Sequence, residues 1–291
     1  MSKIKKAVIP AAGLGTRVLP ASKSMPKEML TLVDKPAIQY IVEEAAKSGI
    51  EDILIIHSRG KSLVEDHFDR SPELETSLQS KGKYDVLEEM KSISDLANIY
   101  YHRQPFPKGL GHAVLCAKSF VGNEPFAVLY GDDVIIGDNP VCKQLMDVYD
   151  KYGKGVVGMK EVTRELVSSY CSLDVENVEN NIYTVSDMIE KPQTDDQIKS
   201  LFSILGRCVL PPEIFEILEN TPPGAGGEIQ LTDAMATLSR STGMYGVDYY
   251  GKRYDMGNKL GILQAIVEVG VKHNEIGEDF KEYLKGFVGG L

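Results

Sequence analysis

Near its start the chain reads Lys6-Ala7-Val8-Ile9-Pro10-Ala11-Ala12-Gly13-Leu14-Gly15-Thr16-Arg17, and this stretch decides the fold. Its first five residues are mostly apolar and stop at small residues and glycines, which is typical of a buried parallel strand that ends in a turn. Residues 11–17 therefore form a predicted loop at the carboxyl end of that strand. Ligands of open α/β sheets bind at this end of the strands.

The residues that follow alternate between helix and strand patterns. Pro36 to Gly49 predicts a helix, because proline suits a first helical turn and glycine often ends one. Further strands are predicted at 53–56, 98–103, 126–130 and 155–159, and further helices at 111–121 and 141–152. This alternation predicts an α/β fold, with a Rossmann-like, mostly parallel (mixed) sheet flanked by helices. The loops after Pro10, Arg103 and Tyr130 are then the expected ligand site.

The second half of the chain adds a hairpin and several helices. Residues 173–191 alternate polar and apolar side chains and predict a hairpin that turns at 177–181. A strand at 201–205, helices at 211–220 and 231–239, a strand at 246–250, and two final helices at 258–273 and 277–288 follow. Residues 59–96 look helical and charged, with no chemistry to assign. We expect one domain, divided into 1–160, 161–257 and 258–291.

Composition excludes some classes of protein. Of 291 residues, 43% are hydrophobic, and 32 Lys and Arg against 42 Asp and Glu leave a net charge of −10. A general nucleic-acid binder needs a basic surface, so nucleic acid is not an expected partner. No apolar run approaches the ~18 residues of a membrane span, and the four cysteines form no C-x-x-C pair. We expect a cytoplasmic protein that does not enter a membrane.

The glycine-rich loop fits neither of two common nucleotide motifs. A dinucleotide fingerprint needs glycine where Val18 stands, and a P-loop needs Gly-Lys-Ser/Thr, which is absent. Small residues at 11, 12, 13 and 15 still let backbone amides approach a phosphate closely. Arg17 adds a permanent charge, and Lys27 supplies a second cation. By itself the loop predicts phosphate contact.

Several motifs together resemble one family. The motifs are Ala-Ala-Gly-Leu-Gly-Thr-Arg at 11–17, Pro-Lys-Glu-Met-Leu at 26–30, Asp-Lys-Pro at 34–36, Gln104 with Gly-Leu-Gly-His-Ala at 109–113, Gly-Asp-Asp at 131–133, Glu-Lys-Pro at 190–192, residues 224–233, and Tyr-Asp-Met-Gly-Asn-Lys at 254–259. They cover nearly the whole length, and they are similar to those of the bacterial UTP–glucose-1-phosphate uridylyltransferases. The resemblance implies a nucleotide-diphospho-sugar transferase fold with a nucleotide-binding half, a sugar-binding half and C-terminal helices.

The implied reaction is attack of the glucose 1-phosphate oxygen on the α-phosphorus of UTP, which gives UDP-glucose and pyrophosphate. A phosphate oxygen is already anionic, so no side chain is needed to activate it. Catalysis then consists of positioning and charge neutralisation. The substrates bring about −4 and −2 charges, which Mg²⁺ and basic side chains would offset.

The resemblance also implies roles for single residues. Arg17 and Lys27 would contact the triphosphate, and Lys191 the sugar phosphate or the α-phosphate. Asp132 would hold Mg²⁺. Asp255 is either a second metal ligand or an aspartate that shapes a turn beside glycine.

Substrate contacts are expected from two further groups. The nucleotide-binding group comprises Ala11, Ala12, Gly13, Leu14, Gly15, Thr16, Gln104, Gly109 and Gly111, and the sugar-binding group comprises Asp133, Cys171, Glu190 and Lys191. The amide of Gln104 can donate and accept at once, which matches the O4 and N3–H of uracil. Glu190 would accept hydrogen bonds from glucose hydroxyls. His112 opens a helix beside glycine and is not expected to act as a base, since no reacting proton is identified.

The chain departs from the family pattern at two cysteines. Cys171 stands where the family has glycine, which leaves the sugar preference open, and Cys208 stands where an aromatic residue is common.

The two rival functions are that of a thymidylyltransferase, or another sugar nucleotidyltransferase, and that of a non-catalytic regulator that binds nucleotide sugars. The complete set of Arg17, Lys27, Asp132 and Lys191 argues against the regulator. The resemblance also suggests a homodimer or homotetramer that uses the C-terminal helices.

Overall fold

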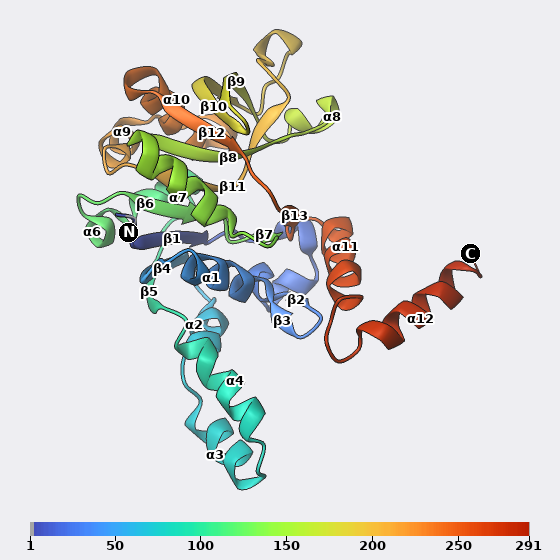
Figure 1. Cartoon of the computed structure of the whole chain (residues 1–291). Coiled ribbons are helices and arrows are strands. Elements are labelled where there is room, and N and C mark those ends of the chain that lie inside the picture. Colours follow the sequence, from blue (N-terminus) through green and yellow to red (C-terminus); the bar gives the residue numbers. More distant parts are fainter. Residues whose placement is uncertain (1–2, 291) are drawn as a thin grey trace.

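A nine-stranded sheet runs through the molecule in the computed structural model, which describes residues 3–290 (Figure 1). The strand order is β5-β4-β1-β6-β11-β8-β12-β10-β9. The strands are β1 (Lys6–Ala11), β4 (Asp52–His57), β5 (Asn98–Arg103), β6 (Phe126–Leu129), β8 (Gly155–Glu161), β9 (Cys171–Glu179), β10 (Ile182–Glu190), β11 (Phe202–Leu210) and β12 (Met244–Asp248).

Smaller elements surround this sheet. Two short ladders pair β7 (Asp133–Ile136) with β13 (Lys252–Asp255) and β2 (Thr31–Leu32) with β3 (Lys35–Pro36). The helices are α1 (Ala37–Lys47), α2 (Ser62–Phe68), α3 (Pro72–Ser80), α4 (Tyr84–Ser94), α5 (Leu110–Leu115), α6 (Lys118–Val121), α7 (Val141–Tyr152), α8 (Arg164–Val167), α9 (Ile214–Asn220), α10 (Leu231–Thr242), α11 (Lys259–Gly270) and α12 (Gly277–Val288).

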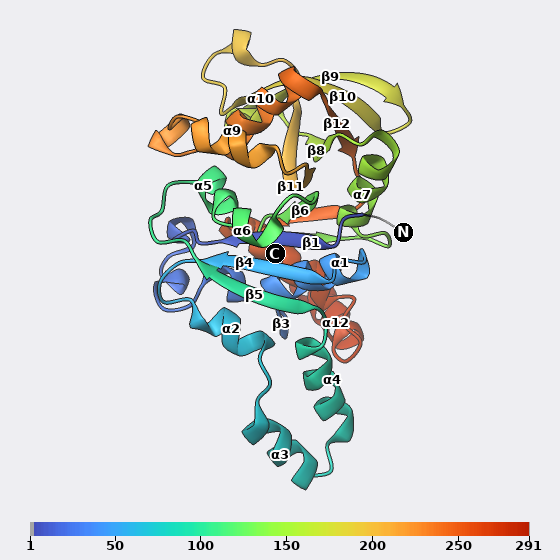
Figure 2. The same ribbon diagram turned by 90° about the vertical axis from the view of Figure 1, so that its left-hand side faces the viewer.

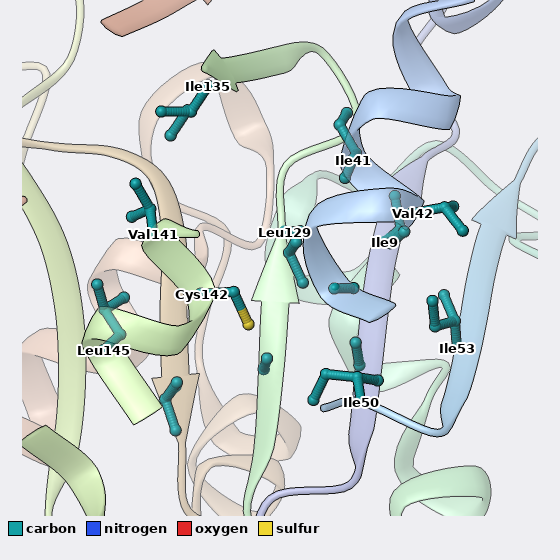
Figure 3. Close-up of a cluster of buried hydrophobic side chains, with 14 of the residues drawn as sticks. Ile9, Ile41, Val42, Ile50, Ile53, Leu129, Ile135, Val141, Cys142 and Leu145 are labelled. Carbon is teal, nitrogen blue, oxygen red and sulfur yellow. The ribbon is translucent and has the colours of Figure 1, made fainter. Parts of the chain in front are cut away.

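The sheet is covered on both faces by helices. On one face, α1 and α7 pack Ile41 and Leu145 against Ile9 of β1 and Leu129 of β6 (Figure 3). On the other face, α5, α9 and α10 cover the side chains that alternate with these along the same strands, such as Val8. Burial on both faces explains why β1, β4 and β6 are apolar almost throughout. The carboxyl ends of these strands are left free for a site.

The sheet is parallel in its first half and mixed as a whole. β5, β4, β1 and β6 are parallel neighbours, as the alternation of strand and helix predicts. β11 then runs antiparallel to both β6 and β8, and β9 and β10 form the predicted hairpin. The sheet is thus the expected α/β sheet, but only half of its pairings are parallel.

Two predicted elements have the wrong boundaries, and two short strands are missing from the prediction. The helix expected at 111–121 is broken into α5 and α6, because the amide of Ala117 bonds three residues back to Val114. The strand expected to end at Leu205 continues as β11 to Leu210. Gly206 adopts a positive φ of 84° there, and the strand passes through an irregularity instead of stopping. β7 and β13, four residues each, were not predicted.

Two parts extend from the body of the molecule. The segment 59–96, expected to be helical, forms α2 and then an arm of α3 and α4 that points away from the sheet (Figure 1, Figure 2). α12 also extends outward at the C-terminal end (Figure 1). Among residues 3–290, no helix is long and apolar enough to span a membrane.

Candidate active site

The glycine-rich loop leaves the sheet at the carboxyl end of β1 and stays exposed. Ala11 is buried as the last residue of the strand, whereas the side chain of Leu14 is 70% exposed. Gly15 has a φ of 66°, and the Ser22 hydroxyl donates to its carbonyl oxygen at 2.7 Å. The loop then passes through three short 3-10 turns, the last of which is η3 (Lys27–Met29). It is thus fixed at its start and open to a ligand along residues 13–17.

A cluster of two cations and two carboxylates faces this loop. The Nζ of Lys27 lies 2.5 Å from the Oδ2 of Asp132. The guanidinium of Arg17 lies 4.0 Å from Asp132 and 3.8 Å from Asp255. Burial opposes both charges of the first pair, but their mutual attraction outweighs it, so the pKa of Lys27 is raised and that of Asp132 is lowered. Four of the predicted site residues therefore meet.

Backbone pairing explains why Asp132 and Asp255 lie close together although more than a hundred residues separate them in the sequence. β13 pairs antiparallel with β7, which places Asp255 opposite Asp133. The amide of Met256 then donates to the carbonyl oxygen of Asp132 at 2.9 Å. Gly257 leaves room for Arg17, because a Cβ at this position would lie 2.4 Å from Nη2. Asp255 also accepts from the amide of Gly257 at 2.7 Å, which is the turn geometry expected of an aspartate before glycine.

The carboxylates of this cluster fit a divalent cation. Arg17 already places positive charge between Asp132 and Asp255, so the two side chains share a position suited to a cation. Mg²⁺ is commonly held by one or two carboxylates together with substrate phosphates. Within residues 3–290, no group of three or more His, Cys, Asp or Glu side chains could hold a metal ion. A metal at Asp132 would therefore also need ligands from the nucleotide.

Asp133 lies behind the cluster with a partner of its own. Its Oδ1 accepts from the Nε of Arg253 at 2.7 Å, and Arg253 also lies 3.3 Å from the hydroxyl of Tyr170. Burial raises the pKa of Asp133 to about 6, although Arg253 acts against this shift. The Asp133 side chain is buried. In this arrangement it orients Arg253, and its role in sugar contact stays a prediction.

The remaining sugar-side residues gather on the β9–β10 hairpin. Cys171 and Glu190 pair across the two strands, and the amide of Lys191 donates to the carbonyl oxygen of Tyr170 at 2.7 Å. The Cys171 thiol is buried and accepts from the amide of Ile204 at 3.3 Å. Burial raises the pKa of Glu190. The Lys191 side chain is exposed, with Nζ 3.7 Å from Glu190. Through Tyr170 this group adjoins Arg253.

The predicted uracil residues lie between the end of β5 and the start of α5. Gln104 follows β5 and is buried, with Nε2 2.9 Å from Nδ1 of His112 and 3.3 Å from the carbonyl oxygen of Gly109. Gly109 has a φ of 99°, and a Cβ on Gly109 or Gly111 would lie 2.8 Å from the carbonyl oxygen of Ile229. These glycines are required by the close approach of the 224–230 loop. His112, whose pKa burial lowers, contacts Gln104.

Arg253 and Tyr170 are site residues that sequence reasoning did not find. Arg253 directly precedes the Tyr254 to Lys259 motif, but a single arginine outside a motif carries no signal of its own in the sequence. Tyr170 directly precedes Cys171, and nothing in the sequence links this tyrosine to Arg253. Only the packing of β13 against β7 brings Arg253 to Asp133.

Known proteins match this chain over nearly its whole length. A model of the nucleotidyl transferase family matches residues 6–270. The UTP–glucose-1-phosphate uridylyltransferase YngB of Bacillus subtilis is 53% identical, over 98% of this chain and 96% of the relative. A uridylyltransferase of Staphylococcus epidermidis is 52% identical, over 98% of this chain and 99% of the relative.

Solved structures agree in fold. The UDP-glucose pyrophosphorylase of Acinetobacter baumannii superposes with a TM-score of 0.90 at 42% identity and covers 98% of this chain and 99% of its own. A pyrophosphorylase complexed with UDP-glucose gives 0.84 at 42% identity, over 93% of this chain and 100% of its own. A glucose-1-phosphate thymidylyltransferase from Bacillus anthracis is only 20% identical, so its TM-score of 0.70 shows a shared fold alone. The chain belongs to the nucleotidyl transferase family and, within it, to the UTP–glucose-1-phosphate uridylyltransferases.

Proposed function

We propose that this chain transfers the uridylyl group of UTP to α-D-glucose 1-phosphate and releases pyrophosphate. The observation that carries the proposal is the agreement over nearly the whole chain, in sequence and fold, with uridylyltransferases and UDP-glucose pyrophosphorylases. The site geometry is consistent with it, because paired cations and carboxylates meet an exposed glycine-rich loop at the carboxyl end of the sheet.

In this reaction a non-bridging phosphate oxygen of the sugar phosphate forms a bond to the α-phosphorus. The bond from the α-phosphorus to the oxygen that bridges the α- and β-phosphorus atoms of UTP breaks, and the electron pair leaves with this oxygen, which becomes a terminal oxygen of pyrophosphate. Because the attacking oxygen is anionic, no general base is required. His112 is accordingly free to hold the Gln104 amide, 2.9 Å away.

The nucleotide side of the site rests on the loop. The amides of residues 11–16 would surround phosphate oxygens, with Arg17 and Lys27 as the cations that neutralise the triphosphate. Gln104 would read the base, and Gly109 and Gly111 keep the neighbouring backbone in place. Lys27 and Arg17 already contact carboxylates, so UTP would replace Asp132 as their partner.

Asp132 and Asp255 are the residues we propose for Mg²⁺. Their hard carboxylate oxygens and the cation that already lies between them support this assignment. Bound Mg²⁺ would neutralise charge on the triphosphate and on the departing pyrophosphate. Lys27 would turn from Asp132 to the phosphates when the nucleotide arrives.

On the sugar side, Glu190 would accept hydrogen bonds from glucose hydroxyls and Lys191 would pair with the sugar phosphate. Glu190 is held in place by β10, while the exposed Lys191 side chain is free to move. Cys171 points into the core next to Ile204, which supports a packing role for the thiol and contact by its backbone alone. Asp133 would act through Arg253.

We also propose that the protein is a homodimer or homotetramer assembled through α12. Of the residues of this helix, only Gly277 is buried. Phe280, Tyr283 and Phe287 stack along one side, with ring centroids 6.3 and 6.0 Å apart. Phe280 is half-buried, whereas Tyr283 and Phe287 are exposed, and neighbouring exposed aromatic rings are typical of a contact surface. A second copy of the chain is the proposed occupant.

The activity is tested by pyrophosphate release over a panel of nucleoside triphosphates and sugar 1-phosphates, with and without Mg²⁺. We expect release with UTP and glucose 1-phosphate, dependent on the metal. A preference for dTTP would move the chain to the thymidylyltransferases. No release with any pair would leave the regulator as the function.

A further inference from the structure

A buried ion pair lies beneath the glycine-rich loop, apart from the residues given roles above. The Nζ of Lys61 is 2.8 Å from the Oε2 of Glu28, and the two side chains are only 8% and 1% exposed. The same ammonium group also donates to the carbonyl oxygen of Ala11. Lys61 precedes α2, Glu28 belongs to η3, and Ala11 ends β1, so one cation joins three separate segments.

The two acceptors of Lys61 stand at the two ends of the loop. Ala11 is the first residue of the glycine-rich loop (residues 11–17) and Glu28 directly follows Lys27, so residues 12–27, with Arg17 and Lys27, lie between the two acceptors. Lys61 is itself carried on a firm base, because Val64 and Phe68 of α2 are buried in the main core. An exposed loop is thus fastened at both ends to one anchored ammonium group.

Stability alone does not require charges at this place. Burial raises the pKa of Glu28 and lowers that of Lys61. Burial thus disfavours both charged forms, and the attraction between the two partners opposes this effect. Apolar side chains of similar volume would avoid this desolvation and often give equal or greater stability. Unlike apolar packing, the ion pair is directional, because the Lys61 ammonium group must contact Ala11 and Glu28 at the same time.

We propose that Lys61 is a positioning residue that fixes the span of the glycine-rich loop for UTP, with Glu28 as its counter-ion. Fixed loop ends would keep the loop amides, Arg17 and Lys27 in the arrangement that binds the triphosphate, which reduces the entropy lost on binding. Lys61 is buried and touches no substrate. The inference rests on the proposed function, because it assumes that the loop binds UTP.

The test compares two matched double variants. Glu28→Gln with Lys61→Met removes this pair. Glu44→Gln with Arg207→Met removes another buried pair, in which Nη2 and Oε2 are 2.6 Å apart and which joins α1 to β11. UTP affinity with Mg²⁺ is measured by calorimetry and the unfolding temperature by fluorimetry. We expect UTP to bind about tenfold or more weakly to the first variant and within about twofold of wild type to the second.

Steady-state kinetics distinguish a loss of loop positioning from general damage to the active site. In the Glu28→Gln, Lys61→Met enzyme the KM for UTP should rise while the KM for glucose 1-phosphate changes less than about twofold. A folded variant with unchanged UTP affinity would overturn the proposal, and so would an equal loss of affinity in the control pair. If wild type itself fails to bind UTP, the proposed function is wrong; the inference fails alone when wild type binds UTP and the variant binds it equally well.

Should the double variant not fold, Glu28→Gln alone carries the test. Its amide is nearly isosteric with the carboxylate and can still accept from Lys61, but the ion pair is lost. UTP binding weaker by about threefold or more supports the proposal. An unchanged affinity overturns it.

Discussion

The charged side chains of the site lie in pairs of opposite charge. Lys27 lies against Asp132, Arg17 lies between Asp132 and Asp255, and Arg253 holds Asp133. Each cation therefore has a partner before any substrate is present. Under the proposed function, a bound triphosphate would exchange these partners: phosphate oxygens would pair with Lys27 and Arg17, and the carboxylates would be left for a divalent cation.

Asp132→Asn should cripple turnover while the protein stays folded. The variant keeps the shape of the side chain but loses the charge that we assign to metal binding, so kcat should fall about 100-fold or more. Pyrophosphate release at saturating Mg²⁺ measures the effect, and circular dichroism checks the fold. Asp138→Asn, the same change on an exposed residue, is the control and should have near wild-type activity. Near wild-type turnover by Asp132→Asn would remove Asp132 from the metal site.

Glu190→Gln should raise the KM for glucose 1-phosphate in a pH-dependent way. A lost charged acceptor costs about tenfold in KM at pH 8. Because burial raises the pKa of Glu190, the wild-type carboxylate takes up its proton at a higher pH than an ordinary glutamate. The ratio of the two KM values should therefore narrow as the pH falls from 8 toward 5. Ionisation of the substrate affects both enzymes alike, and a constant ratio would contradict a role for the Glu190 charge.

At the scale of elements, the pairing of β13 with β7 brings the residues of the site together. It brings Asp255 beside Asp133 and leaves Gly257 directly under Arg17. The 3-10 turn η3 presents Lys27 from the opposite side. The proposed catalytic cluster is thus formed where three elements far apart in sequence converge.

Gly257→Ala should reproduce much of the effect of Arg17→Ala. The added methyl group would lie 2.4 Å from the Arg17 guanidinium and 2.9 Å from Asp255, so Arg17 must move away. We expect the KM for UTP to rise about tenfold in each single variant. The double variant should be little worse than either one, because both changes remove the same interaction. Additive effects would show that Gly257→Ala does not act through Arg17, and unchanged kinetics for Arg17→Ala would show that Arg17 does not contact the triphosphate.

Local patterns were enough to predict long elements but not short paired ones. α7 and α12 have the predicted boundaries, because each is a complete amphipathic pattern between turn residues. β7 and β13 have four residues each and exist through their pairing with each other, which no local pattern encodes. Arg253 was missed for this reason. Lys61 was missed because its partners, Ala11 and Glu28, are set by the packing of α2.

At the scale of the whole molecule, one sheet connects the nucleotide and sugar sides. The loop after β1 and the β9–β10 hairpin belong to the same nine strands, so both substrates would meet over a continuous scaffold. The resemblance indicates most of the proposed site residues along the sequence. Their meeting in space, above all that of Asp132 with Asp255, required the fold.

The outward position of α12 gives a prediction for assembly. Replacing Tyr283 and Phe287 with serine removes two exposed aromatic rings, and the mass measured by light scattering should fall from that of an oligomer toward that of the 32.1 kDa chain. Lys285→Ser, on the same helix, is the control and should leave the mass unchanged. An unaltered oligomer in the aromatic variant would exclude α12 as the contact.

The most direct test of the account follows the phosphorus atoms of UTP. The enzyme is incubated with glucose 1-phosphate and UTP labelled with ³²P at either the α or the γ position, and the products are separated. If the chain transfers the uridylyl group as proposed, the α label appears only in UDP-glucose and the γ label only in pyrophosphate. Label from the γ position in a sugar product, or no labelled UDP-glucose at all, would contradict it.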